Sequence, residues 1–175
     1  MDVGTGASMV YALKYNGWPR VASAMAPLMA RLAFPPDVVA ERTALVPLPL
    51  SSVRQRERGF NQAEALARAL APWWQLPVWS DVLRRHRHTA SQVRLTPSQR
   101  IGNVSRAFAT GPADRDRLAG SHLILVDDVM TTAATLNAAA HALFDGGARI
   151  ISYVTFGRAP EPGDRADSVF DLDPV

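Results

Sequence analysis

The sequence predicts an α/β domain in which helices flank a central, mostly parallel β-sheet. Short apolar runs that resemble strands alternate with segments whose apolar residues recur at helical spacing. The strand expected at 122–126 carries four consecutive apolar residues, which is typical of a central parallel strand that is buried on both faces. A chain of 175 residues is also long enough to build one domain around a sizeable core.

Composition excludes several classes of protein. Hydrophobic residues at 47% and charged residues at 20% are typical of a soluble globular domain. The sequence has neither an apolar stretch long enough to cross a membrane nor the pattern of a signal peptide. Cysteine is absent, which excludes disulfides and thiolate metal sites. We therefore expect a cytoplasmic protein without membrane insertion.

The N-terminal elements follow from apolar spacing and from proline. Helices are expected at 8–16 and 20–34, and the prolines at 35–36 should end the second of them. A short strand should begin at Ala44 and end near Val46, because the prolines beyond it cannot donate hydrogen bonds to a sheet.

The next segment is charged, and we expect residues 51–60 to form a loop. Asn61 can cap a helix that runs to about Ala71, with Glu64 at the third position of a capping box. Further strands are expected at 81–85, 105–109, 122–126 and 149–156. A short helix is expected at 98–103, a longer helix at 135–144, and a loop at 88–97. Residues 159–175 are acidic and lack helical periodicity, so we expect a disordered tail.

The most informative motif lies where the strand at 122–126 ends. Asp127 and Asp128 follow this strand, and a turn rich in hydroxyl groups leads into the next helix. Ligands of parallel sheets bind beyond the carboxyl ends of the strands, and backbone N–H groups at a helix start favour an anion. Paired carboxylates accept hydrogen bonds from sugar hydroxyls or help to hold a hard cation such as Mg2+. The motif predicts a site for a phosphorylated, hydroxylated ligand; alternatively, the two acids only cap the helix.

Basic residues form two further candidate contacts for anions. Residues 82–113 contain no Asp or Glu but six Arg and two His, which indicates a surface for phosphates or nucleic acid, or simply a solvated basic face. We expect no metal site at His86 and His88. Three arginines in the segment 51–60 can bind a polyanion; alternatively, Glu57 neutralises one of them and solvent surrounds the others.

Together these motifs resemble a known family. The segment 123–136 resembles the motif with which type I phosphoribosyltransferases bind phosphoribosyl pyrophosphate (PRPP). The segments 46–63 and 87–108, and the shorter stretch 13–17, resemble the ComF family, which comprises phosphoribosyltransferase-like proteins linked to DNA uptake in naturally competent bacteria. The resemblance covers most of residues 11–158.

The resemblance implies a type I phosphoribosyltransferase fold over 1–158, with a helical N-terminal part at 1–36 and a small hood. It implies that PRPP binds together with Mg2+, which the ligand rather than the protein would hold. A nitrogen nucleophile of an unidentified acceptor would then displace pyrophosphate. The alternative is a non-catalytic module that contacts single-stranded DNA or a DNA-uptake partner such as a helicase. A third hypothesis is a receiver-like or flavodoxin-like domain, but the chain lacks the additional acidic residue and the lysine at the places where a receiver domain would need them.

Matched position by position, the resemblance also implies the roles of individual residues. The catalytic residues would be Asp127, Asp128 and Arg58. The PRPP-binding residues would be Asp127, Asp128, Thr131, Thr132, Ala133, Ala134 and Thr135. The pyrophosphate loop would contain Leu48, Pro49, Arg54, Arg56 and Arg58, and a mobile flap within 84–106 would contribute Arg87, Gln92 and Arg100.

The chain departs from the family pattern in two places. Ala133 stands where the family usually has glycine. A positive φ there would strain alanine by ~1 kcal/mol, but we expect an ordinary φ that tolerates the methyl group. The cysteine-rich zinc ribbon with which ComF proteins typically begin has no counterpart, so no zinc site is implied.

Overall fold

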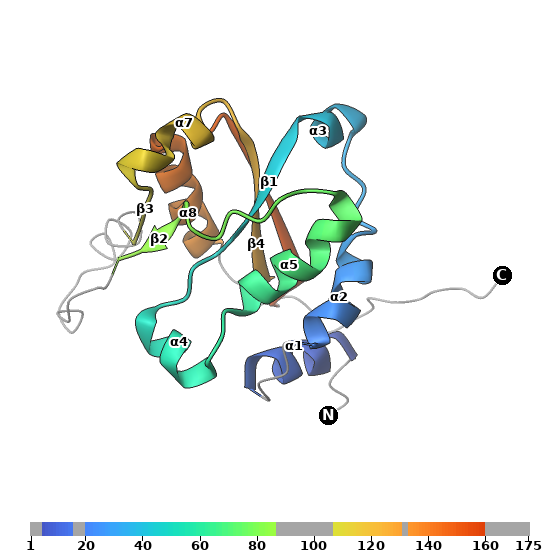
Figure 1. Ribbon diagram of the computed structural model, residues 1–175. Coiled ribbons are helices and arrows are strands. Elements are labelled where there is room, and N and C mark those ends of the chain that lie inside the picture. Colours follow the sequence, from blue (N-terminus) through green and yellow to red (C-terminus); the bar gives the residue numbers. More distant parts are fainter. Residues whose placement is uncertain (1–4, 16–19, 87–106, 131–132, 160–175) are drawn as a thin grey trace.

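The protein is built around a three-stranded parallel sheet in the order β1-β4-β5. The computed structural model describes residues 5–15, 20–86, 107–130 and 133–159. The sheet comprises β1 (Arg42–Pro47), β4 (His122–Met130) and β5 (Ile150–Arg158), with β4 in the centre (Figure 1). This architecture confirms the predicted α/β class. The elements expected at 88–97 and 98–103 and the tail from residue 160 lie outside the described residues.

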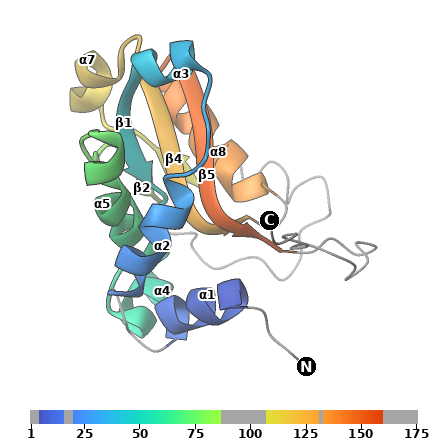
Figure 2. The same ribbon diagram turned by 90° about the vertical axis from the view of Figure 1, so that its right-hand side faces the viewer.

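Helices cover both faces of the sheet and make a separate apolar core on each (Figure 2). One core lies against α8 (Ala134–Asp145) and the other against α2 (Val21–Met29) and α5 (Gln62–Trp74). Alternate residues of β4 face opposite cores, so Leu125 packs toward α8 and Val126 toward α2 and α5. Because both faces of β4 are buried, the strand sequence is apolar without alternation, as the sequence predicts.

The central strand is longer than expected. Its pairing with β5 continues as far as Met130, which is opposite Arg158, so that Asp127 and Asp128 lie within the strand rather than in a turn after it. At the other end, His122 is buried and its ring lies 2.8 Å from the hydroxyl of Ser152. The carboxylates are therefore held on the central strand, which pairs with a neighbour on each side.

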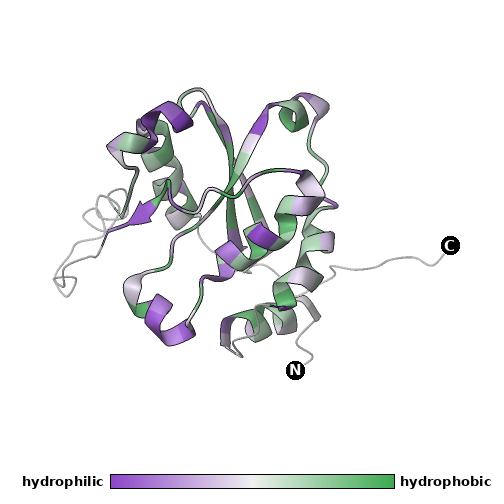
Figure 3. Ribbon diagram, in the orientation of Figure 1, coloured by the Kyte–Doolittle hydropathy of each residue, from purple (hydrophilic) through white to green (hydrophobic). Residues whose placement is uncertain are grey.

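The segment 51–60 is helical, contrary to the expected loop. Helix α4 (Ser52–Arg58) begins where the Ser51 hydroxyl accepts a hydrogen bond from the Arg54 N–H at 3.3 Å. It ends at Gly59, whose φ of 76° is the left-handed conformation of a helix C-cap. Capping at both ends, rather than apolar periodicity, defines this short helix, and its residues are mostly hydrophilic (Figure 3).

Other helix boundaries differ from expectation by a few residues. Helix α1 (Thr5–Tyr15) agrees with the helix expected at 8–16, but α2 ends at Met29 instead of residue 34. The following prolines start a helix rather than end one: α3 (Pro36–Glu41) has Pro36 in its first turn, where no N–H is needed. Asn61 caps α5 as predicted, although α5 continues through Pro72 to Trp74 and Glu64 binds Arg68 at 2.7 Å.

The strands expected at 81–85 and 105–109 form only a two-residue antiparallel pair. This pair, β2 (Arg84–Arg85) and β3 (Phe108–Ala109), lies apart from the main sheet. Short helices η2 (Pro112–Asp114) and α7 (Arg115–Leu118) lead back to β4. Among the described helices, none combines the length and apolarity needed to cross a lipid bilayer.

Helices α1 and α4 lie at the carboxyl end of the sheet (Figures 1 and 2). Leu13 of α1 is fully buried in the core that includes α2 and α5, and this contact anchors the N-terminal helix to the domain. The end of the sheet at which ligands of parallel folds bind is therefore enclosed by two helices that come from different parts of the chain.

Candidate ligand-binding site

A cavity of about 410 Å3 opens at the carboxyl ends of β1 and β4. Its wall combines two carboxylates with four basic side chains: Asp127, Asp128, Lys14, Arg54, Arg58 and Arg85. The loop after β1, the start of α5 and the start of α8 complete the lining with Tyr15, Leu48, Pro49, Leu50, Asn61, Gln62, Ala63, Val129, Met130, Ala133, Thr135 and Leu136. A wall of this composition suits a ligand that carries both negative charge and hydroxyl groups.

Hydrogen bonds fix the loop between β1 and α4 against the sheet. The Leu48 N–H donates to the Val126 carbonyl at 2.9 Å, which extends the pairing of β1 with β4. The Asn61 amide donates to the Leu48 carbonyl at 3.1 Å, and its oxygen accepts from the Ala63 N–H at 3.1 Å. Asn61 thus caps α5 and holds the loop at the same time, which confirms its predicted capping role.

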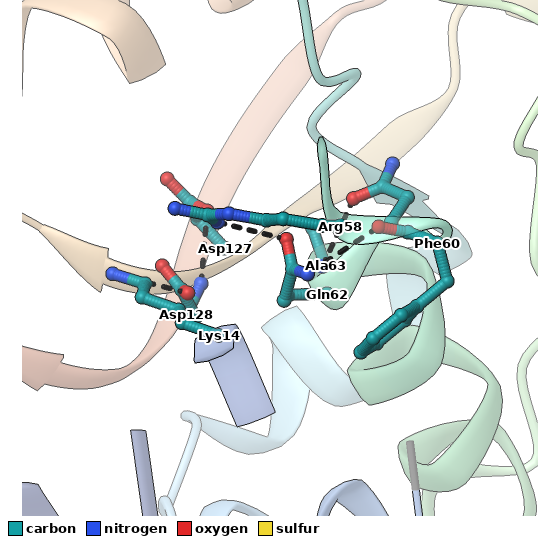
Figure 4. A network of polar contacts seen from close by, with 8 residues as sticks. Lys14, Arg58, Phe60, Gln62, Ala63, Asp127 and Asp128 are labelled. Carbon is teal, nitrogen blue, oxygen red and sulfur yellow. Dashed lines mark hydrogen bonds and ion pairs between the residues drawn. The ribbon is translucent and has the colours of Figure 1, made fainter. Parts of the chain in front are cut away.

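The side chain of Arg58 is held over the cavity by neighbouring polar and aromatic groups. Its guanidinium donates to the Gln62 side-chain oxygen at 3.0 Å and lies 5.7 Å from the centre of the Tyr15 ring. Gln62 is itself buried and donates to the Phe60 carbonyl at 3.3 Å (Figure 4). This arrangement restricts the guanidinium and points it toward the carboxylates of β4 (Figure 4).

The two carboxylates occupy different sides of the central strand. Successive side chains of a strand point to opposite faces, so Asp127 continues the series of Leu125 and Asp128 that of Val126. On its side, Asp128 forms an ion pair of 3.1 Å with Lys14 from α1. The Asp127 carboxylate accepts the N–H of Asp128 at 2.9 Å. The cavity therefore wraps around the end of β4.

Burial changes the acidity of Asp127. Desolvation and the neighbouring Asp128 raise the pKa of Asp127 to about 6, although the hydrogen bond from the Asp128 N–H and the charges of Lys14 and Arg54 act in the opposite direction. Its charge is thus fully developed only above neutral pH. A half-buried carboxylate with a displaced pKa inside a cavity is typical of a functional group.

Two arginines face the cavity without an acidic partner. Among the described residues, neither Arg54 nor Arg85 forms an ion pair. Burial lowers the pKa of Arg85, the charge of Arg54 lowers it further, and Asp127 raises it. The guanidinium also lies 5.2 Å from the centre of the Phe108 ring. Two like charges in one partly buried wall favour an anion that neutralises both.

Some of the residues implied by the resemblance lie in this cavity and others do not. The cavity wall contains Asp127, Asp128, Arg58, Leu48, Pro49, Arg54, Ala133 and Thr135. Arg56 and Ala134 are exposed and are absent from the wall. The segments that contain Thr131, Thr132, Arg87, Gln92 and Arg100 lie outside the described residues, so their roles stay predictions.

Lys14, Tyr15 and Arg85 also line the cavity, although the sequence placed them only within the stretch 13–17 that resembles the family and within the basic stretch 82–113, without a role in this site. Lys14 is the only lysine in the chain, which is a signal that could have drawn attention to it. Arg85 differs from its neighbour Arg84 only in the face of β2 on which it lies, because Arg84 turns away to form an ion pair with Asp114 at 3.4 Å.

The expected ordinary backbone conformation of Ala133 is wrong. Its φ is 55°, in the left-handed region, at the residue that precedes the first turn of α8. Its carbonyl accepts the N–H of Asn137 at 2.8 Å, so the residue begins the helical hydrogen bonding. Alanine is less suited than glycine to this conformation.

We predict different effects on stability for two substitutions of Ala133. The change Ala133→Val should lower the free energy of unfolding by about 1–2 kcal/mol, because a β-branched side chain strongly disfavours positive φ. The change Ala133→Gly should alter it by less than about 0.5 kcal/mol, since the relief of strain is offset by the greater freedom of glycine in the unfolded chain. Urea unfolding of the two variants measures both effects, and equal stabilities would contradict the assigned conformation.

Comparison with known proteins identifies the family of this chain. The family model for the phosphoribosyl transferase domain matches residues 56–173. Competence protein F of Haemophilus influenzae is 36% identical over 94 residues, covering 54% of this chain and 41% of that protein. DNA utilization protein YhgH of Salmonella typhi is 33% identical over 150 residues, covering 82% of this chain and 63% of that protein. The chain thus spans less than two thirds of the length of these relatives.

A solved structure supports the fold separately. The structure described as the allosteric regulatory enzyme of purine biosynthesis superposes with a TM-score of 0.50 at 18% identity, covering 84% of this chain and 30% of that one. These findings confirm the resemblance to ComF-type proteins and to the type I phosphoribosyltransferase fold. The chain belongs to the phosphoribosyl transferase domain family and is a ComF-type member of it.

Proposed function

We propose that this chain binds PRPP together with Mg2+ in the cavity at the end of β4 and transfers the phosphoribosyl group to an acceptor. The observation that carries the proposal is the convergence of Asp127 and Asp128 with Arg54, Arg58 and Arg85 around one cavity of about 410 Å3. Carboxylates suit the hydroxyls of a ribose, and arginines suit a diphosphate. The names of the relatives, competence protein F and DNA utilization protein, support a link to DNA uptake.

Each part of the ligand has a matching part of the wall in this proposal. The carboxylates of β4 would accept hydrogen bonds from the ribose hydroxyls, and the first turn of α8 would receive the 5-phosphate on its free N–H groups. The arginines of α4 and β2 would bind pyrophosphate and stabilise its charge as its bond to the anomeric carbon breaks. A nitrogen atom of the acceptor would form the new bond to that carbon. The protein acts mainly by positioning these groups.

The described residues fit Mg2+ only when the ligand supplies most of its coordination. They contain no cluster of three or more His, Asp and Glu side chains. Of the two carboxylates, Asp128 already forms an ion pair with Lys14 at 3.1 Å. Mg2+ usually binds to one or two carboxylates, substrate phosphates and water, so a cation carried by PRPP is consistent with this wall. When bound, the cation would neutralise the diphosphate and assist its departure.

Isothermal titration with PRPP and Mg2+ tests the proposal. We expect the unaltered chain to bind and the double variant Asp127→Asn, Asp128→Asn to lose at least about 100-fold in affinity, since charged hydrogen bonds contribute about 1.5–3 kcal/mol each. Ribose 5-phosphate, which lacks the diphosphate, should bind more weakly than PRPP. Absence of PRPP binding by the unaltered chain would refute the proposal. We also propose that the protein is cytoplasmic.

A second candidate is a non-catalytic module that contacts single-stranded DNA or a DNA-uptake helicase. The names of the relatives favour it, and so does the basic stretch that begins at Arg84. Two of its arginines have other contacts, however, since Arg84 binds Asp114 and Arg85 lines the cavity. DNA affinity that falls steeply with salt and survives the loss of both β4 carboxylates would favour this candidate over the first.

A further inference from the structure

A single lysine lies at the carboxylate edge of the cavity. The Lys14 ammonium is 3.1 Å from Asp128 Oδ2, and the exposed fractions of the two side chains are 22% and 9%. Lys14 belongs to the last turn of α1, and the adjacent Leu13 is fully buried against the core shared with α2 and α5. The helix that carries the lysine is therefore anchored to the domain, and the lysine side chain is mostly buried.

The ammonium lies against the buried carboxylate oxygen that a metal ion would have to approach. Asp128 Oδ2 is buried and, within the described ranges, has no hydrogen-bond partner in addition to this ionic contact. A buried carboxylate oxygen of this kind requires a positive charge nearby, and either a lysine or a cation satisfies it. Because Asp127 lies on the opposite side of β4, the two carboxylates are poorly arranged to share one ion while Lys14 is present.

The other basic side chains of the cavity also disfavour a free metal ion. Arg54 and Arg58 of α4 and Arg85 of β2 line the same cavity, so four basic groups surround two acids. A free divalent cation that approaches this wall meets a net positive charge, whereas a ligand with its own phosphates does not. The wall therefore favours a metal ion only when it arrives already bound to an anion.

We propose that Lys14 acts as a tethered cation that excludes free divalent metal ions from Asp128 and leaves the carboxylate edge open to the hydroxyl groups of a sugar. This inference deepens the proposed function, because it explains how the two acids could select a ribose rather than a metal. Lys14 is a specificity-determining residue in this view. Its effect on metal ions does not require PRPP, which allows a separate test.

The test measures the binding of Mn2+ alone, in the absence of PRPP, by the electron paramagnetic resonance signal of the free ion. We expect the unaltered chain to bind Mn2+ weakly and Lys14→Met to bind it at least roughly tenfold more tightly, because the substitution frees a buried carboxylate of its partner. The variant Lys14→Arg keeps the charge and should behave like the unaltered chain. Equal Mn2+ affinities of the unaltered chain and Lys14→Met would overturn the inference.

Two controls separate exclusion of metal from loss of folding. The double variant Lys14→Met, Asp128→Asn lacks both partners and should lose the Mn2+ affinity that Lys14→Met gains. Circular dichroism establishes that each variant is folded, and Lys14→Gln replaces Lys14→Met if the latter unfolds. Retention of tight Mn2+ binding by the double variant would show that the ion binds elsewhere and would also overturn the inference. Failure of the chain to bind PRPP would refute the proposed function but leave this result unaffected.

Discussion

The change Asp127→Asn should make the protein more stable at pH 8 while it weakens the proposed PRPP binding roughly 10- to 100-fold. The pKa of Asp127 is raised from 3.8 to about 6 in the folded protein, mainly by burial. As pH rises between these values, the unfolded chain loses its proton before the folded one, so the free energy of unfolding falls. Asparagine has no such charge, and its side-chain oxygen can still accept the N–H of Asp128.

The expected gain is about 2 kcal/mol at pH 8, somewhat less than two pKa units imply because the side chain is partly exposed. At about pH 3 and below, the carboxyl is protonated in both the folded and the unfolded protein, so the gain should disappear. Urea unfolding of both proteins at the two pH values measures the difference. If the stability difference between the variant and the unaltered chain were the same at both pH values, the assigned burial of the charge would be contradicted.

The neighbouring residue, Asp128, provides a matched control for which we expect the opposite effect on stability. Asp128→Asn removes the partner of Lys14 and leaves a partly buried ammonium beside a neutral amide. Loss of one partner of such a pair destabilises the fold, so this variant should unfold more easily at pH 8 than the unaltered chain. Substitution of the two adjacent acids is thus expected to change the free energy of unfolding in opposite directions, which a general effect of charge removal would not produce.

The change Arg85→Ala should weaken PRPP binding by roughly 10- to 100-fold while it alters the free energy of unfolding by less than about 1 kcal/mol. The guanidinium lines the cavity, lacks an acidic partner among the described residues and lies near the like charge of Arg54. Its removal eliminates a donor to the diphosphate but also relieves repulsion between two basic groups. Titration calorimetry and urea unfolding measure the two effects.

Arg84→Ala is the control, because Arg84 precedes Arg85 in the same short strand and faces away from the cavity. It should leave PRPP affinity within about twofold and cost less than about 1 kcal/mol of stability, since its ion pair with Asp114 is largely exposed on the arginine side. If the two variants bind PRPP equally well, the diphosphate does not lie against β2.

The parts of the fold that the sequence predicts are those with a strong apolar pattern. Strand β4 and helix α8 have such a pattern because each is buried along most of its length. Helix α4 was missed because it has no buried residue, and its ends depend on Ser51 and Gly59. The positive φ of Ala133 depends on the path from β4 into α8, which alanine itself does not indicate.

The residues of the candidate site likewise divide into those that a local sequence motif identifies and those that only tertiary packing brings to the cavity. Asp127 and Asp128 lie in a local motif, so the sequence suffices to find them. Lys14 and Arg85 reach the cavity through tertiary packing of α1 and β2, and no spacing in the sequence links them to the acids. Arg54 and Arg58, which the resemblance links to the site, line the same cavity as the acids, although the expected loop that carries them is a helix.

The ion pair between the first described helix and the central strand joins two segments that lie far apart in the sequence. Lys14 meets Asp128 only after β4 has been synthesised and has inserted between β1 and β5. A nascent or truncated chain that ends before this strand holds the lysine without its acid. Such a fragment lacks part of the proposed PRPP site, whereas the folded protein should gain thermal stability with the logarithm of the PRPP concentration once this exceeds the Kd.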